Sequence, residues 1–308
     1  MVDKPSISNI KTTEPDISPS RLWVSAIVLI IVWGSAFTMV GVGVKHLTPI
    51  WLVAGRLIFG AIVVTLWAAA KQEYLPPLTD KRWLWYAALG ITGTVLPFYL
   101  LSVGQLTVDS GITAILVGCM PLITIILAHF FADEKLTPLK FIGFSIGFLG
   151  IFVLFLPDEL ELSLISDWKA QLIILLAAVS YAVTTVFAKR APKTPPSIGA
   201  SMMLICGSIP ALFFALLSGV PTEIPHYMGF LMIIGLGLGS SGLANILYLF
   251  VINKSGPTTL AKINYFTPIA SVFFGVTLLS EPFTWKIVLS FAIVVIGVMV
   301  SRMGQKRV

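Results

Sequence analysis

An arginine lies inside an apolar stretch of the chain. Arg56 sits about two turns into the run from Pro49 to Ala70, which holds no other charged residue. A charge in the hydrocarbon core of a bilayer costs about 2.5 to 3.5 kcal/mol on insertion scales, so we expect this guanidinium to face the interior of a helix bundle. There it could bind a carboxylate or phosphate. Two alternatives stay open, namely contact with the carbonyls of a broken helix and snorkelling to the interface.

A second cation opens a polar cluster further along the chain. Lys262 lies five residues past Pro257, and Asn264 and Tyr265 follow on the next turn. The ammonium could neutralise an anionic group. Its flexible stem also reaches far enough to snorkel to the interface, which is the interpretation we favour.

Aromatic and amide side chains recur within other apolar runs. Aromatic faces with a few hydroxyl and amide groups suit a zwitterionic or amphipathic solute. Tyrosine and tryptophan also form belts at membrane interfaces, so each has a second interpretation. The candidates for lining a cavity are Trp33, Tyr99, Tyr181, Asn245 and Tyr248.

Two prolines lie near the middle of apolar runs. Pro121 and Pro268 each remove one backbone hydrogen bond of a helix and free a carbonyl about a turn earlier. Each is a candidate hinge. A static kink that shapes a cavity is an equally compatible interpretation.

Two glutamates precede threonines at the ends of apolar runs. Glu134 lies before Thr137 and Glu281 before Thr284. We interpret both threonines as N-caps of the helices that follow, so helix-end chemistry is the ordinary role of the glutamates. Proton sensing at gates on the two sides of the membrane is a second hypothesis.

The elements that carry these residues are predicted to be membrane-spanning helices. Of 308 residues, 57% are hydrophobic and 11% are charged, which exceeds the apolar content that one soluble core could bury. The runs are apolar on every side, unlike the alternating strands of outer-membrane barrels. Each is about long enough to span a bilayer as a helix. The ten runs are 22–44, 49–70, 83–106, 111–132, 138–156, 168–188, 197–218, 227–252, 257–279 and 283–301.

The chain is duplicated. Residue types recur at one offset of 147 positions, which indicates two copies of one unit. Matched pairs are Pro49 and Pro196, Gly60 and Gly207, Gly90 and Gly237, Pro121 and Pro268, Glu134 and Glu281, and Gly150 and Gly297. Five spans in each copy is an odd number, so the copies must cross the membrane in opposite directions. The predicted fold class is an all-α integral membrane protein, with ten transmembrane helices in two inverted five-helix repeats.

Basic residues set the orientation. With the N-terminus in the cytoplasm, only Lys45, Lys169 and Lys286 of the basic residues outside the spans fall on the outer side. Both termini are then cytoplasmic. This topology predicts a disordered leader over 1–21, a first repeat over 22–156, an external loop over 157–167, a second repeat over 168–303 and a cytoplasmic tail over 304–308.

Several motifs resemble the EamA domain. Two sets of residues resemble the closing half of that domain. The first is Pro121, Asp133-Glu134-Lys135-Leu136-Thr137, Gly143, Gly147 and Gly150. The second is Pro268, Ser280-Glu281-Pro282-Phe283-Thr284 and Gly297. The opening half of the domain is resembled by Trp33-Gly34-Ser35 with Arg56. The second copy has Met203 in place of Arg56. The resemblance covers residues 22–302.

This resemblance identifies the chain as a member of the drug/metabolite transporter superfamily, of the tandem EamA type. It implies a ten-helix secondary transporter of the inner membrane that exports amino acids or other small metabolites by alternating access. Exporters of cationic drugs or quaternary amines, and of nucleotide- or sugar-like metabolites, remain alternatives. No acidic residue lies near the middle of a run, so uniport or exchange stands beside proton antiport.

Other classes fit the sequence less well. The enzyme motifs His-Glu-x-x-His and Gly-x-Ser-x-Gly are absent, and we expect no catalytic residues, no metal and no cofactor. A lipid flippase or a channel is also disfavoured, the channel because no filter motif occurs. The expected partners are a small-molecule substrate, the lipid bilayer and protons as one candidate coupling ion. We expect no nucleic acid and a monomer or weak homodimer.

Overall fold

The computed structural model describes the backbone of residues 19–131, 137–155, 168–188, 190–221 and 226–303. Side chains are described in the same ranges except at 19, 125, 128, 151, 152, 154, 155, 252–262 and 265. The predicted external loop over 157–167 and the predicted tail over 304–308 lie outside these ranges, as does most of the predicted leader.

Every regular element of the described chain is a helix. The first half contains α1 (Pro19–Gly43), α2 (Pro49–Ala70), α3 (Arg82–Gly90), the π-helical segment η1 (Ile91–Val95), α4 (Leu96–Gly104), α5 (Ser110–Gly118), α6 (Met120–Phe131) and α7 (Pro138–Phe155). The second half contains α8 (Trp168–Ala188), α9 (Pro196–Leu217), α10 (Tyr227–Leu236), the π-helical segment η3 (Gly237–Leu243), α11 (Ala244–Leu279) and α12 (Trp285–Met303).

Eight stretches of described helix are long and apolar enough to cross a membrane. Two shorter apolar stretches, Pro138–Gly150 and Phe266–Leu279, fall where we predicted the fifth and ninth spans. The all-helical membrane class is therefore confirmed, whereas the count of ten spans stays a prediction.

Local chemistry explains where several helices begin. Proline suits the first turn of a helix because it has no backbone N–H that would lack an acceptor there. Helices α2 and α9 both begin with a proline. Helix α1 likewise begins at Pro19, which corrects our predicted leader because Ser20 and Arg21 belong to the first turn of a helix. The predicted N-cap of α7 has the expected geometry, since the Thr137 hydroxyl accepts a hydrogen bond from the Lys140 backbone N–H at 3.4 Å.

An ion pair fixes the connection before α3. Arg82 donates to the Asp80 carboxylate from its backbone N–H at 2.9 Å and from its guanidinium at 2.7 Å. These hydrogen bonds hold the pKa of the Asp80 carboxyl below its ordinary value. Because both side chains remain partly exposed to solvent, the pair orients the connection more than it stabilises the fold.

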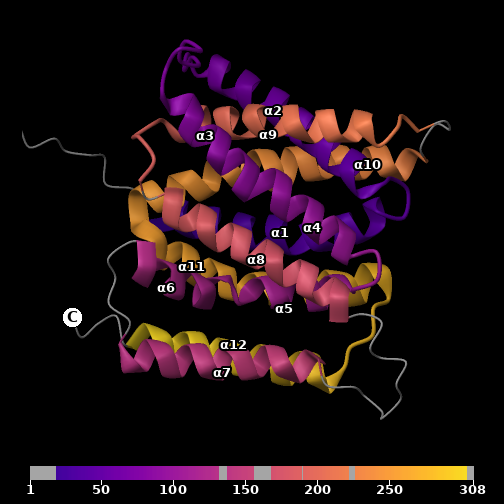
Figure 1. Cartoon of the computed structure of the whole chain (residues 1–308), viewed down its shortest axis with the longest axis vertical. Helices are drawn as coiled ribbons and strands as arrows, with labels where there is room; N and C mark the ends of the chain where they lie inside the picture. Colours follow the sequence, from indigo (N-terminus) through magenta and orange to yellow (C-terminus); the bar gives the residue numbers. More distant parts are fainter. Residues whose placement is uncertain (1–18, 132–136, 156–167, 189, 222–225, 304–308) are drawn as a thin grey trace, which may run out of the picture.

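The helices run roughly side by side in Figure 1, and α2 and α7 each pack on the corresponding helix of the other half. Helix α7 packs on α12 at one edge of the bundle, and α2 packs on α9 at the other. Between these edges, α1 packs on α11, and α8 packs on α4 and α6. The ribbon of α11 turns back on itself in Figure 1, so its two ends run in opposite directions.

The two π-helical segments occupy equivalent places in the two halves. Segment η1 lies between α3 and α4, and η3 lies between α10 and α11. A π turn carries an extra residue and is frequent at functional sites of helical proteins. Each segment is bound by polar side chains of another helix: Ser180 donates to the Thr92 carbonyl at 2.6 Å, and Arg56 binds serines of η3.

Candidate functional site

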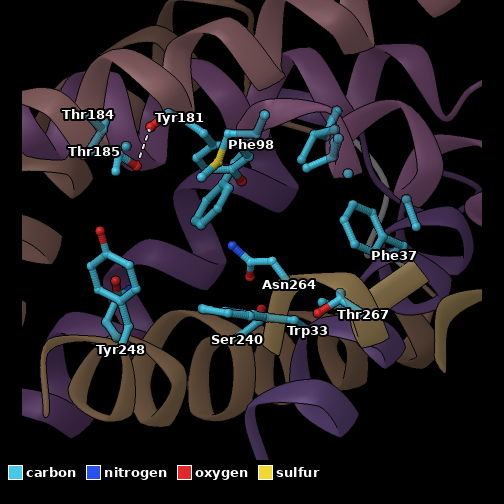
Figure 2. Close-up of a pocket in the computed structure, with 18 of the residues that line it drawn as sticks. Trp33, Phe37, Phe98, Tyr181, Thr184, Thr185, Ser240, Tyr248, Asn264 and Thr267 are labelled. Atoms are coloured by element: carbon cyan, nitrogen blue, oxygen red, sulfur yellow. Dashed lines mark hydrogen bonds between the residues drawn. The ribbon is translucent and has the colours of Figure 1, made fainter. Parts of the chain in front are cut away.

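A cavity of about 200 Å³ lies between the two halves of the chain. Both halves contribute to its wall, the first through helices α1 to α6 with η1 and the second through α8, α9 and α11 with η3. Figure 2 shows side chains converging on it from several helices. Most of the lining is aromatic or aliphatic, and its polar members are Arg56, Thr184, Thr185, Ser240, Asn245, Asn264 and Thr267, with the hydroxyls of three tyrosines.

Among the described residues that line the cavity, Arg56 is the one with a charged side chain. Its side chain is buried, with 3% of its surface exposed, so the guanidinium faces the bundle interior as predicted. It donates to the Ser241 hydroxyl from Nε at 3.0 Å and to the Ser240 hydroxyl from a terminal nitrogen at 2.6 Å. Its central carbon lies 3.8 Å from the centroid of the Phe98 ring. This geometry contradicts snorkelling.

No carboxylate faces the Arg56 guanidinium within the described part of the chain. Hydroxyl dipoles and an aromatic face compensate a buried cation only in part. The guanidinium therefore keeps the capacity to bind an anionic group within the cavity.

Two aromatic pairs flank the cavity. The rings of Trp33 and Tyr248 have centroids 6.3 Å apart, and those of Phe98 and Tyr181 lie 6.5 Å apart. The first pair joins α1 to α11, and the second joins α4 to α8. Figure 2 shows Asn264 projecting into the space between Trp33 and Phe98. Among the described residues, the cavity therefore has mostly apolar walls, with the Arg56 guanidinium and the amides of Asn245 and Asn264 in its lining.

Most of the predicted lining residues meet at this cavity. Trp33, Arg56, Tyr181, Asn245, Tyr248 and Asn264 all contribute to it. Tyr99 does not, because its side chain is 40% exposed on another face of α4 and Phe98 takes its place. The side chains of Lys262 and Tyr265 lie outside the described residues.

The two candidate hinge prolines both line the cavity but differ in their helices. Pro121 follows the interruption between α5 and α6, where Cys119 lies outside both helices. Pro268 lies within α11, which continues through it as one helix. The matched positions thus have different local backbones, and a hinge role stays a prediction for both.

Glu281 performs helix-end chemistry at a helix far from it in sequence. Its carboxylate accepts hydrogen bonds from the Ser110 backbone N–H at 2.8 Å, from the Ser110 hydroxyl at 2.9 Å and from the Gly111 backbone N–H at 3.2 Å. It therefore caps the N-terminus of α5, where the helix dipole also stabilises a negative charge. Glu134, its counterpart in the first repeat, lies outside the described residues.

Three residues around Arg56 were missed by the sequence analysis, namely Phe98, Ser240 and Ser241. The two serines interrupt a glycine-rich run at residues 235–242, which has the composition of a close-packing helix. The adjacent polar pair within that run was the available signal. No sequence signal distinguished Phe98, because the neighbouring Tyr99 has the hydroxyl group that favoured it as a cavity residue. Among the described residues, no cluster of three His, Cys, Asp or Glu side chains forms a metal site.

A sequence model of the EamA-like transporter family matches residues 21–156 and again residues 168–303. The chain belongs to the EamA-like transporter family. It is therefore a membrane transporter of the drug/metabolite transporter superfamily, as the motif resemblance predicted. The two matches fall on the two halves that contribute to the cavity.

Relatives of similar length carry the same class name. An uncharacterized transporter of Archaeoglobus fulgidus is 26% identical over 90% of this chain and 97% of its own. The uncharacterized transporter YoaV of Bacillus subtilis is 24% identical over 91% and 96%. The uncharacterized inner membrane transporter YedA of Escherichia coli K12 is 24% identical over 90% and 89%.

A solved crystal structure has the same fold. It superposes with a TM-score of 0.66 at 17% sequence identity and covers 92% of this chain and 98% of its own. At this identity the likeness concerns the fold alone. The chemistry of the EamA-family cavity described here therefore has to be argued from the side chains that line it.

Proposed function

We propose that this transporter exports small organic solutes that carry a carboxylate, amino acids foremost, and that the carboxylate binds Arg56 in the central cavity. The observation that supports the proposal is a buried guanidinium in the wall of a cavity, with hydroxyl and aromatic contacts and no described carboxylate partner. A substrate carboxylate completes the charge-assisted contacts of that guanidinium.

The size of the cavity favours a small solute. Its volume of about 200 Å³ lies below the range of about 300 to 1,000 Å³ that is usual for drug-sized ligands. The aromatic pairs offer apolar surface to a substrate side chain, and the amide of Asn264 offers hydrogen bonds to its polar head. These features favour a metabolite over a large drug.

A purely cationic solute is disfavoured. The described lining contains Arg56 and no aspartate or glutamate, so a quaternary amine would meet a like charge and no opposite charge. Sugar- or nucleotide-like metabolites remain a second candidate, because a phosphate would also bind a buried arginine.

We propose further that transport proceeds by alternating access between two inverted five-helix repeats, with both termini in the cytoplasm and the protein in the inner membrane. Supporting observations are the two family matches, the pairing of α2 with α9 and of α7 with α12, and the π-helical segment in each half. Inverted repeats let one motif adopt two conformations and exchange them across a central site. The inner-membrane location is proposed by analogy with the relative YedA, which is named an inner membrane transporter.

Transport is driven either by the gradient of the solute itself, through uniport or exchange, or by a proton gradient, through antiport. Proton-coupled carriers commonly use an intramembrane carboxylate, and none lies among the described cavity residues. Imposing a pH gradient on proteoliposomes distinguishes these modes, because only antiport raises the steady-state gradient of the solute.

Counterflow in proteoliposomes tests the substrate proposal. Vesicles are preloaded with unlabelled amino acids, organic acids, amines or nucleosides, and entry of the matching labelled solute is followed. For each amino acid that exchanges, the neutral amino acid amide is tested as a competitor. The variants are Arg56→Gln and, as a control that removes an exposed cation, Lys193→Gln.

Wild-type protein is expected to prefer the carboxylate over the amide, and Arg56→Gln is expected to lose about 10- to 100-fold of that preference. Lys193→Gln is expected to match the wild type. If Arg56→Gln kept the wild-type preference for the carboxylate over the amide, Arg56 would not be the carboxylate site. If only amines exchanged, a cationic substrate would replace the amino acid in the proposal.

A further inference from the structure

A second and larger cavity shares no lining residue with the cavity that contains Arg56. Its volume is about 860 Å³, and its walls come from α1, α2, the start of α9 and the η3–α11 segment. We call it the lateral groove. Its apolar lining includes Val24, Trp67, Leu238, Leu243 and Phe250.

Two cations lie at one end of the lateral groove. Arg21 stands in the first turn of α1 and Lys71 directly follows α2, and both are exposed. The Lys71 ammonium lies 4.8 Å from the centroid of the Trp67 ring. Neither cation has a carboxylate partner in the described part of the chain. Glu73 also borders the groove, and its carboxylate accepts a hydrogen bond from the Ser197 hydroxyl.

The repeat architecture does not require these cations. The positions 147 residues further along are Trp168 and Ser218, which carry no charge. The lateral groove therefore has basic residues at a place where the equivalent positions of the other half have none. Because the copies are inverted, the excess of basic residues on the cytoplasmic side also produces this difference, so the case for a ligand rests on the groove that the two cations border.

We propose that the lateral groove binds an anionic phospholipid, with an acyl chain along the apolar wall and the phosphate between Arg21 and Lys71. The charge of the groove complements a phosphodiester, and its lining complements a hydrocarbon chain. Basic pockets between transmembrane helices on the cytoplasmic side bind anionic headgroups in this way. In the proposed orientation, the basic end of the groove lies at the cytoplasmic leaflet.

The groove adjoins the site of Arg56 through η3. Leu238 and Leu243 of this segment line the groove, while Ser240 and Ser241 between them hold the Arg56 guanidinium. A lipid in the groove therefore contacts the backbone segment that positions the cation of the central cavity.

Tryptophan quenching by brominated lipids tests the proposal. The full chain is reconstituted in vesicles of phosphatidylcholine and phosphatidylglycerol, with bromine on the acyl chains of one lipid at a time. The part of the quenching that Trp67→Phe removes reports on lipid in the groove. The ratio of the two quenching curves gives the binding constant of phosphatidylglycerol relative to phosphatidylcholine at that place.

The test variant is Arg21→Gln with Lys71→Gln, and the matched control is Lys81→Gln with Lys193→Gln, which removes two exposed cations outside the groove. The relative binding constant is expected to fall about five-fold for each groove cation lost and to stay unchanged in the control. Arg21→Lys with Lys71→Arg is expected to retain it.

Three results would overturn the proposal. The first is a wild type without preference for phosphatidylglycerol. The second is an equal fall in the test and control variants, which would indicate diffuse surface charge. The third is quenching of Trp67 only after deletion of residues 2–18, which would make the N-terminal segment the occupant of the groove. None of these outcomes depends on substrate binding at Arg56.

Discussion

The guanidinium of Arg56 stacks on Phe98 at 3.8 Å and donates to two serine hydroxyls at 2.6 and 3.0 Å. Each contact is with a neutral group, so the charge itself is not cancelled. A buried arginine of this kind gains most from an anion that enters the same space, because low dielectric strengthens the interaction. At the scale of single residues, this geometry links the sequence to the proposed carboxylate selectivity.

The adjacent aromatics of α4 provide a matched test of this arrangement. Phe98→Leu removes the ring under the Arg56 guanidinium, and Tyr99→Leu removes a ring that is 40% exposed and outside the cavity. A cation–π contact contributes about 0.5 to 2 kcal/mol. We therefore expect Phe98→Leu to weaken substrate affinity about 2- to 30-fold in counterflow, while Tyr99→Leu stays within two-fold of wild type. Equal effects of the two variants would contradict the assigned role of Phe98.

At the scale of elements, glycine contacts set how closely the paired helices approach. A Cβ atom on Gly297 of α12 would meet the Gly143 carbonyl oxygen at 2.6 Å and the Gly147 Cα at 2.7 Å. A Cβ on Gly150 would meet the Ser290 carbonyl oxygen at 3.0 Å. These are backbone atoms, which cannot move aside as a flexible side chain can. These glycines therefore allow α7 and α12 to pack with their backbones in close contact.

Gly297→Ala should separate α7 from α12. Because the contacts are with backbone atoms, overpacking should cost the upper part of about 1 to 3 kcal/mol, which exceeds the gain in helix propensity of about 1 kcal/mol. The control is Gly41→Ala in α1, where the added Cβ would lie 3.7 Å from its nearest neighbour. Thermal unfolding in detergent should show a lower Tm for Gly297→Ala and an unchanged or higher Tm for Gly41→Ala. A Tm for Gly297→Ala at or above that of the wild type would rule out the packing argument.

At the scale of the molecule, equivalent residues of inverted repeats must lie on opposite sides of the membrane. Lys71 follows α2 and Ser218 follows α9, at positions separated by 147 residues. Both are exposed. The proposed topology places Lys71 in the cytoplasm and Ser218 outside.

Sided labelling checks this topology. In a background where Cys119 and Cys206 are replaced by alanine, Ser218→Cys should react with a membrane-impermeant maleimide in intact spheroplasts. Lys71→Cys should react only after permeabilisation. Labelling of both cysteines from the same side would require a parallel arrangement of the repeats, and a reversed pattern would place the termini outside.

The sequence alone determined the membrane class, the places of most helices and the burial of Arg56. The physical reason is that the bilayer imposes one rule on every segment: an apolar run of sufficient length becomes a helix, and a charge within it faces inward. The proline at the start of α2 and the matched residues at one offset could be seen without coordinates. The EamA motifs could likewise be seen in the sequence.

Only the tertiary structure decided which residues surround Arg56. Ser240 lies 184 positions away in sequence, and no local pattern links it to the cation. The choice of Phe98 over Tyr99 depends on the rotation of α4, which follows the π-helical segment η1 and so departs from the phase of a regular α-helix. Glu281, in the connection between α11 and α12, caps α5 because the packing of α11 against α5 brings them together. Sequence periodicity describes one helix at a time, whereas these contacts depend on how separate helices rotate against one another.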